Sequence, residues 1–414
     1  MTGSGDRADW TGRRLELAVG SVAHGGHCVA RADQEPRGGQ TGGRVVFVRH
    51  ALPGERVVAV VTEDHGGSFC RADAIEVLEA AAGRVAPPCP LAGPGRCGGC
   101  DWQHATADTQ RMLKAQVVAE QLHRLAGIDR RVDVEELPGG LLGRRSRVRL
   151  VVGKDGRAGL RGHRSHQVVP LAGTGCAIAL PGALDRALER RWRPGSELEI
   201  TMDGLGRVHV RSIQRVRGRP RAKQLTGGVA HENAAGRQWR LDAHGFWQVH
   251  PSAADVLARA VGQWTRAGAG AHVWDLYAGV GLFAAVLAGQ VGADGSVLAV
   301  ESARRAVADG EANLADLPQV RWRAGSVEKV LGAVDERPEV VVLDPPRKGA
   351  GKSVVAAIVA GGPRRVVYVA CDPAAMARDV ATFTSHGYHL AELRAFDAFP
   401  MTHHVECVAL LESS

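Results

Sequence analysis

The chain contains 414 residues, a length that predicts two or three domains. Hydrophobic residues make up 45% and charged residues 23%, which is typical of a soluble globular protein and excludes an intrinsically disordered one. No apolar run approaches the ~18 residues that a membrane helix needs. The first residues, MTGSGDRADWTGRR, contain no apolar segment of the kind that a secretory signal requires. We therefore expect a cytoplasmic protein without a membrane partner.

Positive charge is concentrated in one segment of the chain. The whole sequence has 52 Lys and Arg against 44 Asp and Glu, a net charge of +8. Between Arg144 and Lys223, however, 17 Arg and 2 Lys face only 6 acidic residues, so this segment alone carries the excess. Such a segment favours a surface that contacts nucleic-acid phosphates, with a solvated basic face as the alternative.

Two regions precede the last part of the chain. Residues 10–80 contain short apolar runs separated by glycine and proline turns, which predicts a small barrel of the OB type. The runs are Leu15–Val19, Val45–Val48, Val57–Val61 and Ser68–Val77. Residues 84–240 contain a group of cysteines, a helix expected at Thr106–Leu125, and alternating polar and apolar residues. This alternation predicts a central antiparallel β domain, with strands at Arg145–Val151, Leu198–Met202 and Arg207–Ile213.

From residue 241 to residue 414 the pattern changes to α/β. Buried-type strands separated by stretches long enough for crossover helices predict a parallel, doubly wound, Rossmann-like sheet. These strands are expected at Val273–Leu276, Val297–Val300, Val340–Leu343 and Val366–Ala370. Two further strands, Tyr388–Phe396 and Val405–Leu411, are close enough in sequence to pair antiparallel.

Polar side chains stand at the ends of the four parallel strands. They are Asp275, Glu301, Asp344 and Cys371. Ligands of doubly wound sheets bind outside the carboxyl ends of the strands, so these side chains are the first candidates for a functional site.

The turn after the first of these strands predicts a nucleotide-containing cofactor. Gly279 and Gly281 allow the backbone to approach a ligand closely, and Glu301 lies at the distance at which an acid meets ribose hydroxyls. The pattern also fits a dinucleotide, so NAD is the alternative. Two features favour S-adenosylmethionine: Asp275 suits its cationic end, and Asp344-Pro-Pro-Arg347 resembles the acidic Pro-Pro loops of base-modifying methyltransferases.

Cys371 and Glu406 are candidates for covalent chemistry. Cys371 follows a strand and precedes Asp372-Pro373, which predicts a thiol near a helix N-terminus and a candidate nucleophile. A buried structural cysteine is the alternative. Alternation along the last strand places Glu406 on the face of Val408, where burial would raise its pKa toward that of a useful base.

Four other cysteines have the spacing of a metal site. Cys89, Cys97 and Cys100 form a C-x7-C-x2-C pattern, and Cys176 can supply a fourth thiolate. The pattern suits zinc or an iron–sulfur cluster, and spacing alone does not choose between them.

Seven segments in order resemble the RNA uracil-5-methyltransferase family, in particular its members with an N-terminal TRAM domain and an iron–sulfur cluster. The resemblance covers nearly the whole chain. Its segments are Ala51–Arg56, Cys97–His104, Phe246–Gln248, Asp275–Phe283, Asp344–Gly349, Tyr368–Asp379 and Phe399–Val408. Asp372 departs from the family's more usual Asn, and its charge should oppose formation of the Cys371 thiolate.

The resemblance implies a function and a set of roles. It implies a [4Fe-4S] cluster on Cys89, Cys97, Cys100 and Cys176, and S-adenosylmethionine contacts from Gln248, Tyr277, Glu301 and Asp344. Cys371 would be the nucleophile that adds to C6 of uracil, and Glu406 the base that removes the C5 proton. The target would be a flipped or single-stranded uridine, in ribosomal RNA rather than transfer RNA, with no obligate protein partner.

Three other functions are alternatives to uracil-5 methylation of RNA. A methyltransferase acting on an exocyclic amine or a protein glutamine would usually carry an aromatic residue where Arg347 stands, and would leave Cys371 without a role. A non-catalytic RNA-binding or ribosome-assembly factor would be marked by loss of Cys371 or Glu406. An NAD-dependent oxidoreductase is the remaining alternative.

Overall fold

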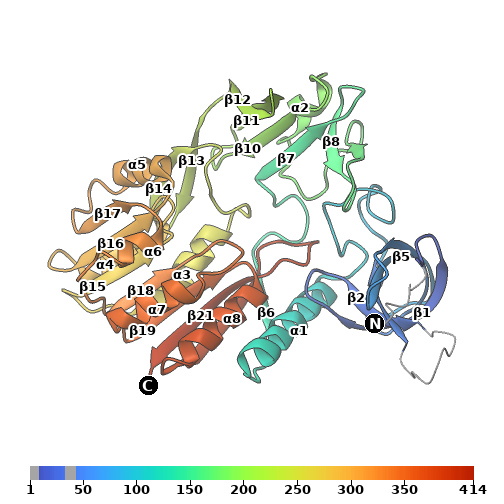
Figure 1. Ribbon diagram of the computed structural model, residues 1–414. Helices are drawn as coiled ribbons and strands as arrows, with labels where there is room; N and C mark the ends of the chain where they lie inside the picture. The colour runs from blue at the N-terminus through green and yellow to red at the C-terminus, as the bar shows by residue number, and fades with distance from the viewer. Residues whose placement is uncertain (1–8, 33–42) are drawn as a thin grey trace. The chain divides into compact units, whose positions relative to one another are not determined.

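The computed structural model describes residues 9–32 and 43–414 (Figure 1). The chain divides into two compact units. The first unit extends to Val117 and includes Leu160–Val169 and Met401–His403; the second contains Val118–Gly159, Pro170–Pro400 and His404–Ser414. No helix in the described part of the chain is both long and apolar enough to cross a membrane.

A closed five-stranded barrel forms most of the first unit. Its strands follow the order β1-β2-β3-β5-β4. Their bounds are β1 Arg14–Val22, β2 Cys28–Ala32, β3 Arg44–Arg49, β4 Arg56–Asp64 and β5 Phe69–Glu79. The four predicted strands are all present, and alternate residues such as Val46 and Val48 are fully buried in the barrel core. β2 was missed because it is only five residues long, CVARA, and its arginine interrupts the apolar run.

The remainder of the first unit packs beside the barrel. Trp102 is 1% exposed, and its indole N–H donates to the Gly26 carbonyl at 3.1 Å. Helix α1 (Ala107–Ala126) follows, as predicted, and its first half buries Leu113 and Val117 in the same core. The boundary between the two units falls inside this helix.

The second unit begins with antiparallel structure, as predicted for the centre of the chain. A six-stranded sheet has the order β12-β11-β10-β7-β8-β9, and the turn between β8 and β9 belongs to the first unit. The bounds are β7 Arg147–Val152, β8 Ala158–Arg161, β9 Val168–Pro170, α2 Asp185–Glu189, β10 Glu197–Met202, β11 Val208–Val216 and β12 Arg219–Thr226. A separate hairpin joins β13 Val229–Ala234 to β14 Arg237–Asp242.

An eight-stranded sheet of order β17-β16-β15-β18-β19-β21-β20-β6 dominates the second unit (Figure 1). β17 to β19 are parallel, and β21 runs antiparallel to both β19 and β20. The strands are β6 Val134–Glu136, β15 His272–Leu276, β16 Ser296–Glu301, β17 Val320–Ala324, β18 Val340–Leu343, β19 Arg365–Ala370, β20 Tyr388–Asp397 and β21 Glu406–Ser413. The predicted parallel, doubly wound sheet is therefore confirmed.

Helices cover both faces of this sheet. α3 and α4 pack on the face that buries Val273, Val342 and Val408, whereas α6, α7 and α8 pack on the face of Leu276 and Leu343. The helices are α3 Ala253–Thr265, α4 Leu282–Val291, α5 Arg304–Asn313, α6 Val327–Leu331, α7 Lys352–Gly361 and α8 Pro373–Thr384. Because both faces are buried, the central strands are apolar throughout, and this explains why their bounds were predictable to about one residue.

Candidate active site

The register of the parallel strands brings the predicted polar side chains to one edge of the sheet. Leu276 on β15 pairs with Val300 on β16 and with Leu343 on β18, and Leu343 pairs with Tyr368 on β19. The carboxyl ends of these four strands are therefore aligned. Asp275, Glu301, Asp344 and Cys371 stand at those ends, within one to three residues of the paired positions.

A tight turn connects β15 to α4. Tyr277 and Gly281 both have positive φ, 62° and 92°, and a Cβ at position 281 would lie 2.8 Å from the Leu314 side chain. Glycine is thus required there by backbone conformation and by space. Glu301 fixes the turn, because its Oε2 accepts a hydrogen bond from the Gly279 N–H at 3.0 Å. The other oxygen of Glu301 accepts from the Ala303 N–H at 2.7 Å.

Asp275 is a buried carboxylate without a counter-ion. It is 0% exposed, and neither oxygen has a well-formed hydrogen bond among the described residues. Burial raises its pKa well above the usual range, and the charges of Asp344 and Glu301 raise it further, while the Ala284 N–H opposes them. A buried acceptor of this kind at a nucleotide-binding turn suits a ligand that carries positive charge, and S-adenosylmethionine fits this requirement.

Gln248 lies in the segment between β14 and α3. Its side chain is buried, whereas Phe246, two residues earlier, is 71% exposed. Ser146 anchors the segment, since its backbone N–H and its hydroxyl both donate to the Val249 carbonyl, at 2.9 and 2.8 Å.

Cys371 and Glu406 meet through the antiparallel pairing of β19 with β21. Ala370 pairs with Cys407, so the next step of the same register places Cys371 opposite Glu406. Glu406 is 3% exposed and also pairs with Phe396 on β20, while Cys371 is partly buried. Val408 and Leu410 are buried on one face of β21, as the alternation predicted for the face that carries Glu406.

The electrostatics of this pair favour protonated groups. The pKa of Cys371 is raised to about 12, chiefly by burial and also by Glu406, Asp344 and Asp372, whereas Arg347 lowers it. Burial also raises the pKa of Glu406 well above its usual range, and that of Asp344 to about 7. The site therefore contains groups that hold protons near neutral pH, as acid–base chemistry requires.

Asp372 and Asp379 fix the helix that follows Cys371. Asp372 is the N-cap of α8 and accepts a hydrogen bond from the Ala375 N–H at 2.8 Å. Asp379, on the buried side of the same helix, accepts from the Ala350 N–H at 2.7 Å and from the Gly351 N–H at 3.2 Å. It thereby ties the loop after Asp344 to α8. The sequence interpretation missed this role, although a lone acid among the apolar residues of a helix face was a usable signal.

The four cysteines that the sequence predicts as metal ligands are divided between the two units. Cys89, Cys97 and Cys100 lie in one loop of the first unit, and Cys176 belongs to the second unit. Two sulfurs accept hydrogen bonds, Cys97 from the Gly99 N–H at 3.4 Å and Cys100 from the Gln103 amide at 3.2 Å, as thiolate ligands do. The donor chemistry suits a cluster. However, in residues 9–32 and 43–414 no three His, Cys, Asp or Glu side chains are arranged to hold a metal ion.

Comparisons with known proteins identify relatives of the whole chain. A family model for tRNA (uracil-5-)-methyltransferases matches residues 333–414, and a TRAM domain model matches residues 10–74. Two proteins described as uncharacterized RNA methyltransferases, from Streptomyces avermitilis and Streptomyces coelicolor, are each 46% identical. The alignments cover 97% of this chain and 98% and 93% of the relatives.

A solved structure shares the fold. The tRNA (uracil-54, C5)-methyltransferase of Pyrococcus abyssi, in complex with S-adenosyl-L-homocysteine, superposes with a TM-score of 0.67. The match covers 89% of this chain and 96% of that chain at 21% sequence identity.

Proposed function

Because the chain belongs to the RNA methyltransferase family and contains a TRAM domain, we propose that it methylates C5 of a uridine in RNA with S-adenosylmethionine as the methyl donor. The observation that supports this proposal is the register of β19 and β21: Ala370 pairs with Cys407, and Cys371 and the buried Glu406 are the next residues of the two strands. A thiol and a carboxylate at neighbouring positions are the two groups that this chemistry needs.

Uracil C5 is too weakly nucleophilic to accept a methyl group directly. The Cys371 sulfur, as thiolate, adds to C6 and breaks the C5–C6 double bond, so that the electron pair is delocalised over C5 and the C4 carbonyl. S-adenosylmethionine would supply an electrophilic methyl group: C5 bonds to the methyl carbon while the methyl–sulfonium bond breaks, and the electron pair of that bond leaves with S-adenosylhomocysteine. Glu406 then removes the C5 proton, the C5–C6 double bond re-forms, and the C6–sulfur bond breaks with return of the electron pair to Cys371.

The charged groups around Cys371 are consistent with these roles. The pKa of Cys371 is high chiefly because the thiol is buried; Glu406, Asp344 and Asp372 raise it further, and Arg347 opposes them. A positive charge near these carboxylates, such as that of a sulfonium ligand, would lower the pKa of Cys371 and favour loss of its proton.

Four side chains are proposed to contact the cofactor. Glu301 and Asp344 stand at the ends of β16 and β18, the two strands that flank β15. Tyr277 begins the tight turn after β15, and Gln248 is buried in the segment before α3. Asp275 joins this set on account of its unsatisfied buried carboxylate.

RNA is proposed to bind the β11–β12 hairpin. No acidic residue occurs between Asp203 and Glu232 in the sequence, and nearly all of β12 is exposed. The basic residues of the hairpin are Arg211, Arg215, Arg217, Arg219, Arg221 and Lys223. Such a ribbon provides phosphate contacts without base-specific readout.

The domain bounds, the RNA substrate and the metal cluster are also part of the proposal. We infer three domains, a TRAM barrel at 10–80, a central RNA-binding domain at 84–240 and a methyltransferase domain at 241–414. We also infer ribosomal RNA as the substrate, and a [4Fe-4S] cluster on Cys89, Cys97, Cys100 and Cys176. No step of the reaction passes through that cluster.

The decisive experiment offers unmethylated ribosomal and transfer RNA to the protein together with labelled S-adenosylmethionine, and measures labelled nucleosides by mass spectrometry. Label should appear in 5-methyluridine from ribosomal RNA, and it should vanish with Cys371→Ala. Label in transfer RNA alone would overturn the ribosomal assignment. No label in either RNA, with cofactor binding intact, would overturn the activity and favour a non-catalytic RNA-binding protein or a protein substrate.

A further inference from the structure

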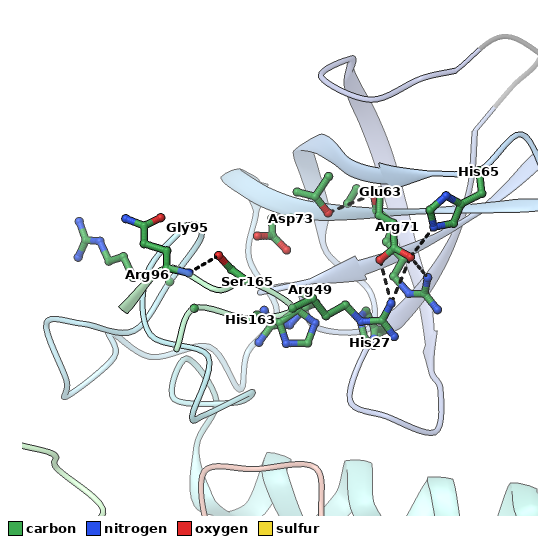
Figure 2. Close-up of a pocket in the computed structure, with 16 residues that line it drawn as sticks. His27, Arg49, Glu63, His65, Arg71, Asp73, Gly95, Arg96, His163 and Ser165 are labelled. Atoms are coloured by element: carbon green, nitrogen blue, oxygen red, sulfur yellow. Dashed lines mark hydrogen bonds and ion pairs between the residues drawn. The ribbon is translucent and has the colours of Figure 1, made fainter. Parts of the chain in front are cut away.

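A cavity of about 570 Å³ lies within the first unit, between the barrel and two loops (Figure 2). Binding pockets for small molecules typically measure ~300–1,000 Å³. The barrel forms one wall, with residues at or next to β2, β3, β4 and β5. The loop that contains Cys89, Cys97 and Cys100, called the cysteine loop below, contributes Gly95 and Arg96. The turn between β8 and β9 forms the third wall. The residues used below are His27, Arg49, Glu63, Arg71, Asp73, His163 and Arg164.

Gly98 allows the cysteine loop and the β8–β9 turn to meet. The Gly98 N–H donates to the Arg161 carbonyl at 3.0 Å, and Cys97 forms a β-bridge with Gly162. A Cβ at position 98 would lie only 2.5 Å from the backbone nitrogen of His163. The glycine between the paired cysteines therefore permits the contact that places His163 in the cavity wall.

Arg49 is a buried cation with hydrogen-bonding capacity to spare. The residue is 6% exposed, and its guanidinium makes a single hydrogen bond within the described residues, to Asp101 at 3.5 Å. The other oxygen of Asp101 accepts from His403 Nδ1 at 2.7 Å. A guanidinium has five N–H donors, so most of those of Arg49 are left for a ligand in the cavity.

Arg71 and Arg164 add to the positive charge of the wall. Both donate to the one carboxylate of Glu63, at 2.9 and 2.8 Å, so two guanidinium groups share a single counter-ion. The other carboxylate of the wall, Asp73, makes no hydrogen bond among the described residues, and burial raises its pKa. Together with Arg49, these side chains favour an anionic ligand.

Two histidines add unused polar atoms to the same wall. His27 Nδ1 lies 3.2 Å from the Gly25 carbonyl and must be the protonated nitrogen, which leaves Nε2 as an acceptor. Nε2 of His27 and Nε2 of His163 are buried without a partner among the described residues. Burial and the charge of Arg49 lower the pKa of both rings to about 4, so both are neutral at pH 7. A matching ligand carries N–H or O–H donors as well as an anion.

We propose that this cavity binds one unpaired ribonucleotide of the RNA, with its phosphate on Arg49 and Arg164 and its hydroxyl or base N–H groups on His27 and Asp73. A nucleotide is the common biological group that combines an anion with such donors at this size. The proposal rests on RNA being the substrate, and it adds a binding site in the first unit to the reaction centre of the second.

The test measures binding of a labelled single-stranded oligoadenylate to the full-length protein by fluorescence anisotropy at several salt concentrations. Oligoadenylate contains no uracil, so its binding is independent of methylation. Arg49→Gln and Arg164→Gln should each weaken binding about tenfold, and each should reduce the slope of log Kd against log salt by about 0.7. Arg14→Gln is the control, since Arg14 is an exposed arginine of the barrel outside the cavity.

The outcomes separate the sources of the ligand. Arg164 is half exposed, so its variant should fold even where Arg49→Gln does not. Equal effects in all three variants would mean general surface charge and would overturn the site. Tight binding of adenosine monophosphate that depends on Arg49, with oligoadenylate binding unaffected, would make it a site for a free nucleotide and would overturn the RNA assignment.

Discussion

The Tyr368 hydroxyl donates a hydrogen bond to Asp379 Oδ2 at 2.7 Å, and both residues are buried. Tyr368 lies on β19, three residues before Cys371, and Asp379 lies on α8, eight residues after it. The same carboxylate accepts the N–H groups of Ala350 and Gly351. Asp379 therefore joins the strand and the helix that flank Cys371 to the loop that follows Asp344.

Asp379→Asn should disturb this junction. An amide presents one oxygen and one donor group, so at least one of the three buried N–H or O–H donors loses its acceptor, which costs about 1–3 kcal/mol of stability. Tyr368→Phe should cost less, because both backbone donors keep their acceptor. Thermal unfolding gives the stabilities, and calorimetric titration with S-adenosylmethionine gives the effect on the loop. The exposed Asp294→Asn is the control; an equal loss there would remove the special role of Asp379.

Gly281→Ala should impair both folding and cofactor binding. A Cβ at this position meets the Leu314 side chain and the Trp322 ring, and φ of 92° is unfavourable for alanine. We expect a loss of about 1–3 kcal/mol in unfolding free energy and at least a tenfold loss in S-adenosylmethionine affinity.

Gly289→Ala is the matched control, within α4, the helix for which Gly281 is the N-cap. A Cβ there meets nothing within 4 Å, and the residue is exposed. Alanine in a helix interior is more stable than glycine by about 0.5–1 kcal/mol, so this variant should gain stability. If the two variants behaved alike in denaturant unfolding, the close contact at Gly281 would not be the cause.

Much of this arrangement could be predicted from the sequence, for identifiable reasons. The central strands are buried on both faces and read as continuous apolar runs, and the strand-end residues follow directly from them. β17 was missed because most of its residues are exposed and two of them are Arg321 and Arg323. The contact of Asp379 with Ala350 was not predictable, since it depends on how a loop and a helix pack. The same holds for the inclusion of residues 160–169 and 401–403 in the first unit.

Asp372→Asn should make Cys371 more reactive. The pKa of this thiol is about 12, and Asp372 is one of the charges that raise it. The thiolate is the reactive form, so alkylation should be slow at pH 7. As long as the pH is below that pKa, the rate should rise about tenfold for each unit by which the pH is increased. Removing the charge lowers the pKa and moves the profile to lower pH, while asparagine still caps α8.

Peptide mapping after iodoacetamide treatment measures this rate separately for each cysteine. Cys407 is fully buried, and burial raises its pKa too, so it should stay unmodified in both proteins. An unchanged rate at Cys371 across the pH range would show that the charge of Asp372 does not reach the thiol.

Cys97→Ser should remove the proposed cluster. Anaerobically purified protein should be brown and contain iron, and the variant should be colourless and iron-poor, because a hydroxyl is a poor substitute for a thiolate ligand. Cys70→Ala is the control, since Cys70 is a core residue of the barrel. A colourless wild-type protein that contains zinc would contradict the cluster and leave the cysteines as a zinc site.

Glu406→Gln should trap the reaction after methyl transfer. Cys371 still adds to C6 and C5 still accepts the methyl group, but no carboxylate remains to take the C5 proton, so the C6–sulfur bond cannot break. The covalent RNA–protein adduct should appear as a slow band on a denaturing gel, and it should be absent when Cys371→Ala is combined with Glu406→Gln. Turnover at the wild-type rate without an adduct would assign proton removal to another group, for which the neighbouring Asp344, with a pKa of about 7, is the next candidate.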